Sequence, residues 1–416
     1  MKFSVSGKSL GFFVWAAACL LGALPYFLSG GIPDFTDAVF ESVSGFTTTG
    51  LSAVADLELL PKPLILWRAA TCWLGGAAVV ALSGAVFPLF GAGGSPFPAT
   101  EAAGYEAGKP VFRIAKTART PAALYLALTA ALALLLRVFG MNWFDAWVHA
   151  LSILSTGGFS SRNAGVAFYQ STAIEWTCAA FMILAGCNLT LIARLPQSGL
   201  REAGRSSEAR AYGAVILTAG LIIFFSILPQ SSSAEEALRF AVFHAGSILS
   251  TTGLFCTDYA SWPPPAQGAL FFALFIGGCT GSAAGGVKVI RQAILWKQTG
   301  IEVKKLVHPG GVFALRINGS SGGKDLVHRT AAFVFSYFLL LLCGAFLVSS
   351  AGEDVFTSLT ASLVTLGNTG LGLGALGPFS SPPEFPGYVK WGLSVIMLLG
   401  RLELWTVLGF FTPRRN

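Results

Sequence analysis

Four short apolar segments, each about 12–15 residues long, recur along the chain and end in breaks of similar composition. The segments span 33–46, 142–154, 235–249 and 353–366. The breaks that follow them read TTTGL (47–51), STGGF (155–159), STTGL (250–254) and GNTGL (367–371). A helix of this length is too short to cross a bilayer, which takes about 20 residues. Because threonine and glycine both disfavour helix interiors, each break predicts a point where a short helix stops.

The four breaks stand in register with one another. Their last glycines are separated by 108, 95 and 117 residues, and they are Gly50, Gly158, Gly253 and Gly370. Twelve residues before these glycines stand Ala38, Ala146, Ala241 and Ser358, and nine residues before them stand Glu41, His149, His244 and Ala361. Self-similarity at a period of about a hundred residues indicates a repeat architecture. The repeated unit is predicted to be a helix, a short re-entrant helix, an extended break and a second helix.

Longer apolar segments flank the short ones in pairs, and they span 10–29, 63–90, 121–139, 172–195, 211–229, 266–296, 330–350 and 388–411. Each is about as long as a helix that crosses a bilayer. The chain is 54% apolar and only 11% charged, which is typical of a polytopic membrane protein. We therefore predict an all-α polytopic membrane protein with four helix–pore-loop–helix repeats around one pseudo-fourfold pore. It would have eight spanning helices and four re-entrant pore helices.

The four repeats are expected to form one integrated membrane domain. Their predicted boundaries are 1–90 for the first repeat, 91–195 for the second, 196–300 for the third and 301–416 for the fourth. The second helix of the third repeat is expected to be broken, because five glycines fall within ten residues of its sequence.

The placement of charge orients the predicted repeats in the membrane. Basic residues gather in alternate loops, around 109–119, 194–210 and 297–329, and at the C-terminus. By the positive-inside rule these loops and both termini are predicted to be cytoplasmic, in a protein of the plasma membrane. The opposite loops carry most of the acidic residues, which attract cations. The net charge of +7 therefore reflects topology and the lipid bilayer rather than a nucleic-acid partner.

Non-helical backbone at membrane depth is stable only where protein buries it or water adjoins it. An extended break can turn its carbonyl oxygens toward a common axis, and glycine leaves no side chain in the way. Four such breaks around one axis would form a ring of oxygens that replaces the hydration shell of a cation. The partly negative C-terminal ends of the short helices would point at that ring. The alternative is that the breaks are ordinary helix caps.

Seven stretches of the sequence resemble one family closely. They are FESVSGFTTTGLS (40–52), LSTGGFS (154–160), ILSTTGLF (248–255), FIGGCTGSAAGGVKVIR (275–291), HPGGVFALRING (308–319), GNTGLGLG (367–374) and GRLELWTVL (400–408). On these motifs the sequence resembles the Trk/Ktr/HKT superfamily of potassium transporters, and most closely its bacterial TrkH/KtrB-type membrane subunits. The bacterial TrkH type usually carries two helices before the first repeat. This chain begins just before its first repeat helix, so either an eight-helix form or a late gene start is expected.

The resemblance implies a potassium selectivity filter in which K⁺ is the transported ion. The filter residues would be Thr47, Thr48, Thr49, Gly50, Ser155, Thr156, Gly157, Gly158, Ser250, Thr251, Thr252, Gly253, Gly367, Asn368, Thr369 and Gly370. In the plant branch of the superfamily a serine at the first glycine position goes with sodium preference, so Gly50 implies potassium. The fourth break departs from the pattern, since Gly367 and Asn368 replace the hydroxyl-bearing pair.

The resemblance also implies two kinds of partner. One is a second copy of the chain in a homodimer of pores. The other is a cytosolic RCK-type ring of TrkA/KtrA-like regulatory subunits that bind nucleotide. No covalent cofactor is expected on this chain, and any nucleotide dependence would come from that partner.

The glycine-rich stretch of the sixth long segment predicts a loop inside the membrane. A straight helix gains nothing from this composition, because each interior glycine costs about 1 kcal/mol relative to alanine. The alternative is close helix packing along the GxxxGxxxG face of Gly277, Gly281 and Gly285. The resemblance implies a gate below the filter, formed by Gly278, Cys279, Thr280, Gly281, Ser282, Ala283, Ala284, Gly285 and Gly286.

Three basic residues are predicted to lie near the pore: Lys288, Arg291 and Arg401. Ionisable residues inside a membrane segment usually face a cavity, a partner or the interface. Lys288 and Arg291 follow the glycine-rich stretch and could alternatively snorkel to the cytoplasmic surface. Arg401 lies deeper, where it would either pair with an acidic residue or place a positive charge beside the conduction path.

The sequence offers no catalytic constellation, so the chain is predicted not to be an enzyme. GLGALG (372–377) matches a dinucleotide fingerprint, but it follows a short helix rather than a strand. The four histidines show no metal-ligand spacing. Broken helices also occur in secondary transporters, which leaves two alternatives open: a potassium symporter coupled to H⁺ or Na⁺, and a sodium-permeable cation transporter.

Overall fold

Helices account for nearly all regular structure in the computed structural model, which describes residues 2–90, 110–199, 204, 206–317, 320–321, 324–380 and 384–402. The first half of the chain forms α1 (Lys2–Leu28), α2 (Phe35–Phe46), α3 (Lys62–Phe90), α5 (Pro110–Val138), α6 (Trp143–Leu154), α7 (Thr172–Gly186) and α8 (Leu189–Ser198). The second half forms α10 (Ser207–Ile227), α11 (Ala234–Leu249), α12 (Pro264–Leu274), α13 (Val289–Val307), α14 (Lys324–Ser349), α15 (Val355–Leu366) and α16 (Gly387–Arg401).

The connections add short elements. Single 3₁₀ turns lie at Leu57–Leu59, Gly165–Tyr169, Leu228–Gln230, Tyr259–Ser261 and Gly374–Leu376. After α13 two short strands, β1 (Arg316–Ile317) and β2 (Ser320–Ser321), pair antiparallel. This hairpin was not predicted from the sequence. With two residues per strand, it leaves the all-helical character of the fold unchanged.

The four short helices α2, α6, α11 and α15 begin in the same way. Their N-cap residues are Asp34, Asn142, Ser233 and Asp354, and each cap side chain accepts a hydrogen bond from the backbone N–H three residues later. Such caps satisfy N–H groups that have no partner within the helix. At Asp354, hydrogen bonds from the side chain and backbone of Thr357 hold the pKa of the carboxyl below its usual value. The caps therefore fix where each short helix starts.

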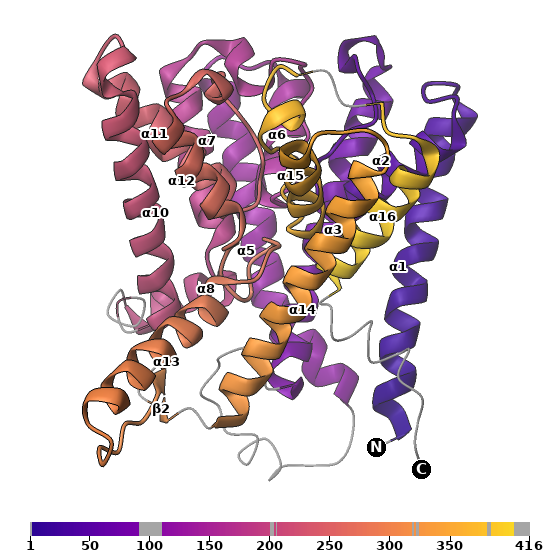
Figure 1. Ribbon diagram of the computed structural model, residues 1–416. Coiled ribbons are helices and arrows are strands. Elements are labelled where there is room, and N and C mark those ends of the chain that lie inside the picture. The colour runs from indigo at the N-terminus through magenta and orange to yellow at the C-terminus, as the bar shows by residue number, and fades with distance from the viewer. Residues whose placement is uncertain are drawn as a thin grey trace.

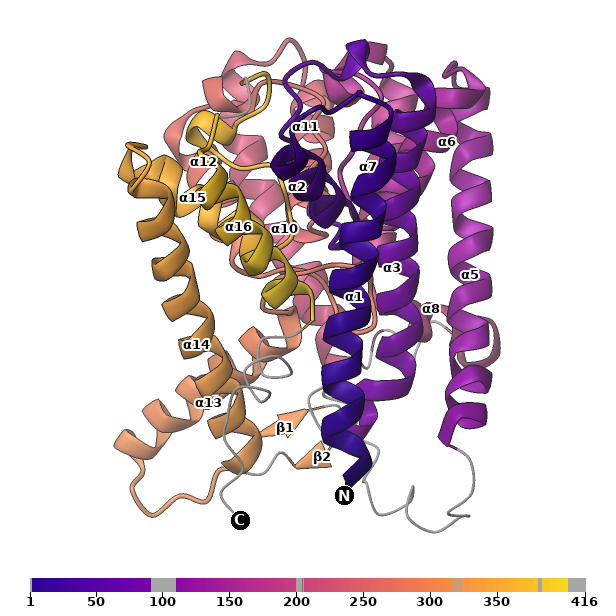
Figure 2. The ribbon, with the colours of Figure 1, turned by 90° about the vertical axis from the view of Figure 1, so that its right-hand side faces the viewer.

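The helices close into a circle in which the last helix meets the first short one. The short helix α2 packs against α1 and α3, α6 against α5 and α7, α11 against α10 and α12, and α15 against α14 and α16. Each short helix and its two neighbours form a group, and adjacent groups are in contact. The contacts between groups are those of α3 with α6, α7 with α11, α13 with α14, and α16 with α2. In Figures 1 and 2 the short helices lie in the upper half of the molecule, while α1, α3, α5, α10 and α14 extend below them.

Long apolar helices identify the molecule as a membrane protein. Within the described residues, four helical segments are long and apolar enough to cross a membrane: Lys62–Ala81, Arg119–Val138, Ser207–Gln230 and Asp325–Ser349. Their outward faces carry large exposed apolar side chains, such as Phe225 and Phe346 at 66% and 80% exposure. Lipid solvates side chains of this kind.

One predicted span is wrong as a continuous helix. Residues 172–195 were expected to form a single segment, but α7 ends at Gly186 and α8 begins at Leu189. Cys187 between them is extended, and the Asn188 side chain caps α8 by accepting a hydrogen bond from the Leu191 N–H at 3.0 Å. A glycine followed by a good N-cap residue favours an end and a new start over one continuous helix.

Several other predicted spans differ in extent. Helices α1, α5 and α14 begin earlier than the predicted residues 10, 121 and 330. Segment 266–296 is interrupted over 275–288, a longer break than the predicted 278–286. The last segment, predicted over 388–411, is helical from Gly387 to Arg401. Residues 403–411 lie outside the described part of the chain.

The contact between α3 and the end of α2 leaves no room for a side chain at Gly75. A Cβ there would lie 2.1 Å from the carbonyl oxygen of Phe46. We expect Gly75→Ala to force the helices apart and to lower stability by about 1–3 kcal/mol, the usual cost of overpacking. Thermal unfolding in detergent measures the effect. Gly213→Ala in α10 is the control, because nothing lies within 4 Å of its Cβ. Equal melting temperatures for the two variants would contradict the expectation.

Candidate functional site

The four breaks follow the same backbone path. Each short helix ends at a right-handed residue, which is followed by a left-handed residue with φ between 53° and 57°: Thr48, Thr156, Thr251 and Asn368. Two residues later comes the last glycine of the break, Gly50, Gly158, Gly253 or Gly370, with φ between 70° and 82°. In every break the N–H between them donates to the carbonyl five residues earlier, as from Thr49 to Ser44 at 2.8 Å. The repeat seen in the sequence is thus a repeat of backbone geometry.

The breaks lie side by side in a closed ring. A Cβ added to any of the four glycines would lie 2.0–2.1 Å from a carbonyl oxygen of the next break. The contacts join Gly50 to Gly157, Gly158 to Thr252, Gly253 to Thr369, and Gly370 to Thr49. Each oxygen belongs to the residue directly before the glycine of its own break. A side chain at any of these glycines would therefore collide with the neighbouring break.

Hydroxyl groups of the first three breaks form hydrogen bonds within the break or with the short helix before it. Thr47 and Ser155 donate to carbonyls of their own short helices at 2.7 and 2.8 Å. The hydroxyls of Thr47 and Thr49 lie 2.8 Å apart, and those of Ser250 and Thr252 lie 2.7 Å apart. These bonds satisfy the side chains locally.

The fourth break joins the first through a side chain. Asn368 donates from Nδ2 to the hydroxyl of Thr49 and to the carbonyl of Met397, both at 3.0 Å. The residue that departs from the repeated pattern therefore links the two breaks that are furthest apart in the sequence.

The ring is suited to a hard cation. The C-terminal ends of four short helices meet there, and each end carries partial negative charge. Carbonyl and hydroxyl oxygens are the ligands that such cations prefer. Within the described residues no group of three or more His, Cys, Asp or Glu is placed to hold a metal ion. A cation at this ring would thus be held by backbone and hydroxyl oxygens.

The glycine-rich loop over 275–288 lies directly against two of the breaks. The Gly285 N–H donates to the Thr251 hydroxyl at 2.8 Å. A Cβ on Gly285 would lie 2.3 Å from the carbonyl oxygen of Gly367. The loop is closely packed, and Cys279, Ser282, Ala283 and Ala284 are each at most 2% exposed. The predicted loop residues are therefore brought together with the third and fourth breaks.

Groups from three different parts of the chain anchor this loop. The Arg401 guanidinium donates to the Ala283 carbonyl at 2.6 Å. Glu208, in the first turn of α10, accepts the Thr280 N–H at 2.5 Å. The interruption between α7 and α8 contributes as well, because the Gly186 carbonyl accepts the Cys279 N–H at 2.8 Å.

Two side chains that contact the loop, Asn188 and Glu208, were not predicted from the sequence to lie there. Asn188 was not singled out, yet it lies against Gly281, and the Gly-Cys-Asn order was a usable signal for a helix start. The contact of Glu208 had no signal in the sequence, because an acidic residue in a first helical turn is common.

The three predicted basic residues lie close to the loop. Lys288 donates to the Ala284 carbonyl, and Arg291 donates to the Val287 carbonyl at 3.3 Å. Arg291 also lies over the Phe333 ring, 4.0 Å from its centre. Lys288, Arg291 and Arg401 are all buried, at 6–8% exposure. Their side chains hold loop carbonyls instead of reaching to the surface.

Fold and site together define a class: a helical, multi-pass membrane protein with a buried ring of oxygens suited to a cation. The sequence matches the family described as TrkH, cation transport protein, over residues 14–197 and 216–415. The chain belongs to this family.

Similar proteins agree with this assignment. The Trk system potassium uptake protein TrkH of Halomonas elongata is 37% identical, over 96% of this chain and 83% of that protein. The protein of the same description from Escherichia coli K12 is 34% identical with the same coverage. The crystal structure of the potassium transporter TrkH from Vibrio parahaemolyticus superimposes with a TM-score of 0.89 at 33% identity. That match covers 99% of this chain and 85% of the other.

Loosening the loop is expected to expose Cys279. Glu208→Ala removes the acceptor of the Thr280 N–H, and an unsatisfied buried donor costs about 1–3 kcal/mol. We expect maleimide labelling of Cys279 to accelerate roughly fivefold or more. The measurement uses a chain whose other six cysteines are replaced by alanine. Glu58→Ala, in the 3₁₀ turn before α3, is the control. Equal labelling rates in the two variants would show that Glu208 does not hold the loop.

Proposed function

We propose that this chain takes up potassium across the plasma membrane through the ring formed by the four breaks. The observation that carries the proposal is the closed series of glycine–carbonyl contacts from Gly50 through Gly158 and Gly253 to Gly370. Such a ring replaces the hydration shell of a cation with fixed oxygens. Relatives described as potassium uptake proteins and as a potassium transporter support the choice of ion.

The selectivity filter of this proposal comprises 47–50, 155–158, 250–253 and 367–370, with K⁺ at their oxygens. Glycine occupies the last position of each of these four filter segments, so no side chain narrows the ring there. On this basis potassium is preferred to sodium.

The proposed architecture is a pseudo-fourfold pore with eight spanning helices and four re-entrant ones. Its support is the common backbone path of the breaks and the circular packing that ends with α16 on α2. The repeats would divide near residues 90, 195 and 300. By the positive-inside rule the basic loops favour a cytoplasmic position for both termini, with the upper half of Figure 1 outside the cell.

The loop over 278–286 is proposed as the gate. Its support is its position against Thr251 and Gly367, where it would obstruct a path beyond the ring. Arg401 would hold the closed form through the Ala283 carbonyl and place a positive charge beside the path. Lys288 and Arg291 would fix the cytoplasmic end of the loop.

Two partners are proposed: a second copy of the chain, and a cytosolic RCK-type ring that carries the nucleotide. The support is that the relatives are named as proteins of a Trk system. No cofactor is proposed on this chain beyond the transported potassium.

Radioactive rubidium uptake into proteoliposomes tests the function. We expect uptake that is inhibited by potassium and little affected by sodium. Gly50→Ser places a side chain against the Gly157 carbonyl and is expected to make sodium compete at least several-fold better. Equal competition by both ions in the unaltered chain would overturn potassium selectivity. Uptake that requires a proton or sodium gradient would favour the coupled symporter instead.

A shortened loop tests the gate. Deletion of residues 282–284 removes the Ala283 carbonyl held by Arg401 and the bulk below the ring. We expect faster basal rubidium uptake with the potassium preference retained, measured against the intact chain at equal protein density. Slower uptake by a deletion variant that remains well folded would indicate a structural role for the loop.

A further inference from the structure

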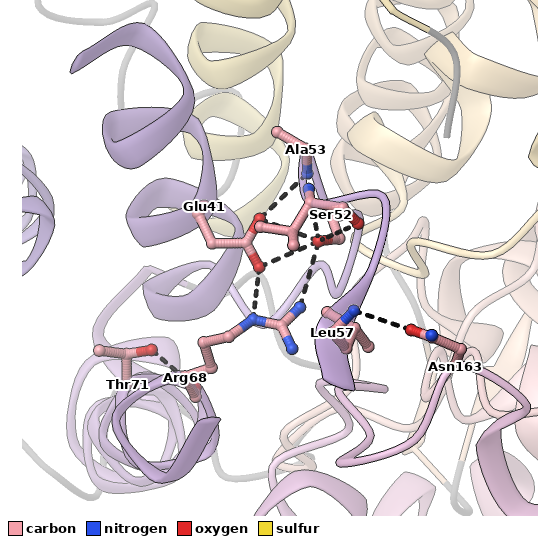
Figure 3. Close-up of polar contacts among 8 residues, drawn as sticks. Glu41, Ser52, Ala53, Leu57, Arg68, Thr71 and Asn163 are labelled. Carbon is pink, nitrogen blue, oxygen red and sulfur yellow. Dashed lines mark hydrogen bonds and ion pairs between the residues drawn. The ribbon is translucent and has the colours of Figure 1, made fainter. Parts of the chain in front are cut away.

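A buried ion pair lies behind the outer end of the first break. Glu41 of α2 and Arg68 of α3 are 0% and 1% exposed, and Arg68 Nε donates to Glu41 Oε1 at 2.6 Å (Figure 3). Placing two charges in a dry interior costs several kcal/mol per ion before their attraction is counted. A hydrophobic pair of similar size is often as stable, so overall stability alone does not account for these two residues.

Both partners of the pair bind the chain just after Gly50. Glu41 Oε2 accepts the Ala53 N–H at 3.0 Å. The Ser52 hydroxyl donates to Glu41 and accepts from Arg68 Nη2 at 3.2 Å (Figure 3). Charge-assisted hydrogen bonds are shorter and stronger than neutral ones. The ion pair therefore fixes where the first break leaves the ring.

Arg68 also reaches the second break. Its guanidinium lies 4.0 Å from the centre of the Phe159 ring, and Phe159 directly follows Gly158. Phe159 is 2% exposed, so its ring has little room to move away. A desolvated cation–π contact of this kind contributes up to about 2 kcal/mol. One side chain thus joins the outer ends of two neighbouring breaks.

The second and fourth breaks are held at the same position by other side chains. In the second repeat, His149 occupies the position of Glu41 and lies 3.1 Å from the hydroxyl of Ser160, the counterpart of Ser52. At the fourth break, the hydroxyl of Tyr259, which comes from the third repeat, donates to the carbonyl of Gly372, two residues after Gly370. Fixing the residue two positions beyond the glycine is therefore a recurring arrangement, and in the first break an ion pair provides it.

We propose that Glu41 and Arg68 are specificity-determining positioning residues, which hold the outer ends of the first two breaks and so set the spacing of the oxygen ring. This inference rests on the proposed potassium uptake through that ring. A ring held at fixed spacing discriminates between cations that differ in size, whereas a looser ring contracts around the smaller sodium ion.

Arg68→Lys is the main test. Lysine keeps the positive charge beside Glu41 but lacks the fork that reaches Glu41 and Ser52 together, and it lacks the planar face over Phe159. We expect the preference for potassium over sodium to fall about threefold to tenfold, the size of effect that the typical net contribution of one hydrogen bond gives. The readout is the ratio of sodium to potassium concentrations that halve rubidium uptake into proteoliposomes.

Arg239→Lys is the matched control. Arg239 of α11 forms a largely buried ion pair with Glu175 of α7, at 2.8 Å, and also contacts Thr172 and Glu235. It should leave the ion preference unchanged. Ser52→Ala is the second variant. It keeps the ion pair but removes the tethered hydroxyl, and it should lower the preference in the same direction as Arg68→Lys.

The outcomes separate the two proposals. An unchanged preference in Arg68→Lys and Ser52→Ala, with a lowered preference in Gly50→Ser, would overturn the inference and leave the proposed filter standing. An equal loss in Arg68→Lys and Arg239→Lys would also overturn it, because a general loss of structure would then explain both. An unaltered chain without preference for potassium would overturn both proposals.

Discussion

Carbonyl oxygens that point away from their own helices inside a membrane are unstable unless something satisfies them. In this molecule four breaks bring such oxygens together, and each oxygen lies against the glycine of a neighbouring break. The arrangement requires short helices that stop at mid-depth, caps that fix where they start, and longer helices that enclose them. The rest of the fold depends on keeping these four backbone segments in contact.

The four repeats share a backbone path but differ in the side chains that support it. Hydroxyl groups brace the first three breaks, while Asn368 bridges from the fourth to the first. The residue two positions after the last glycine is held by an ion pair in the first break, by a histidine in the second and by a tyrosine in the fourth. Equal geometry from unequal supports means that different side chains can hold the same backbone path in each repeat. A chain with four linked repeats has this freedom, which four identical subunits lack.

The helical fold, the short helices and the four breaks were predictable from sequence, because glycine and threonine act through local backbone preference. The period of about a hundred residues then required the breaks to be equivalent. The interruption at Cys187 was missed, because the apolar run over 172–195 has the length and hydropathy of one span, and length outweighed the weaker signal of Asn188 after Gly186.

The partners of buried charges were not predictable. Glu41 was identified only as one of the four residues that stand nine positions before the glycines, and Arg68 was not singled out. Their pairing depends on how α2 packs against α3. For the same reason Arg401 was placed near the path without its contact to Ala283, which comes from a segment 118 residues away. Local preference fixes where helices stop, while tertiary packing decides which charges meet.

The contact between the first and last breaks has a consequence for biosynthesis. Asn368 bonds to Thr49 across 319 residues, and the Thr49 carbonyl lies against Gly370. While the chain is being inserted into the membrane, the first three breaks have an open side until the fourth arrives. The oxygens on that side must stay hydrated or be covered in the meantime. The completed ring therefore forms only once the fourth break has been inserted.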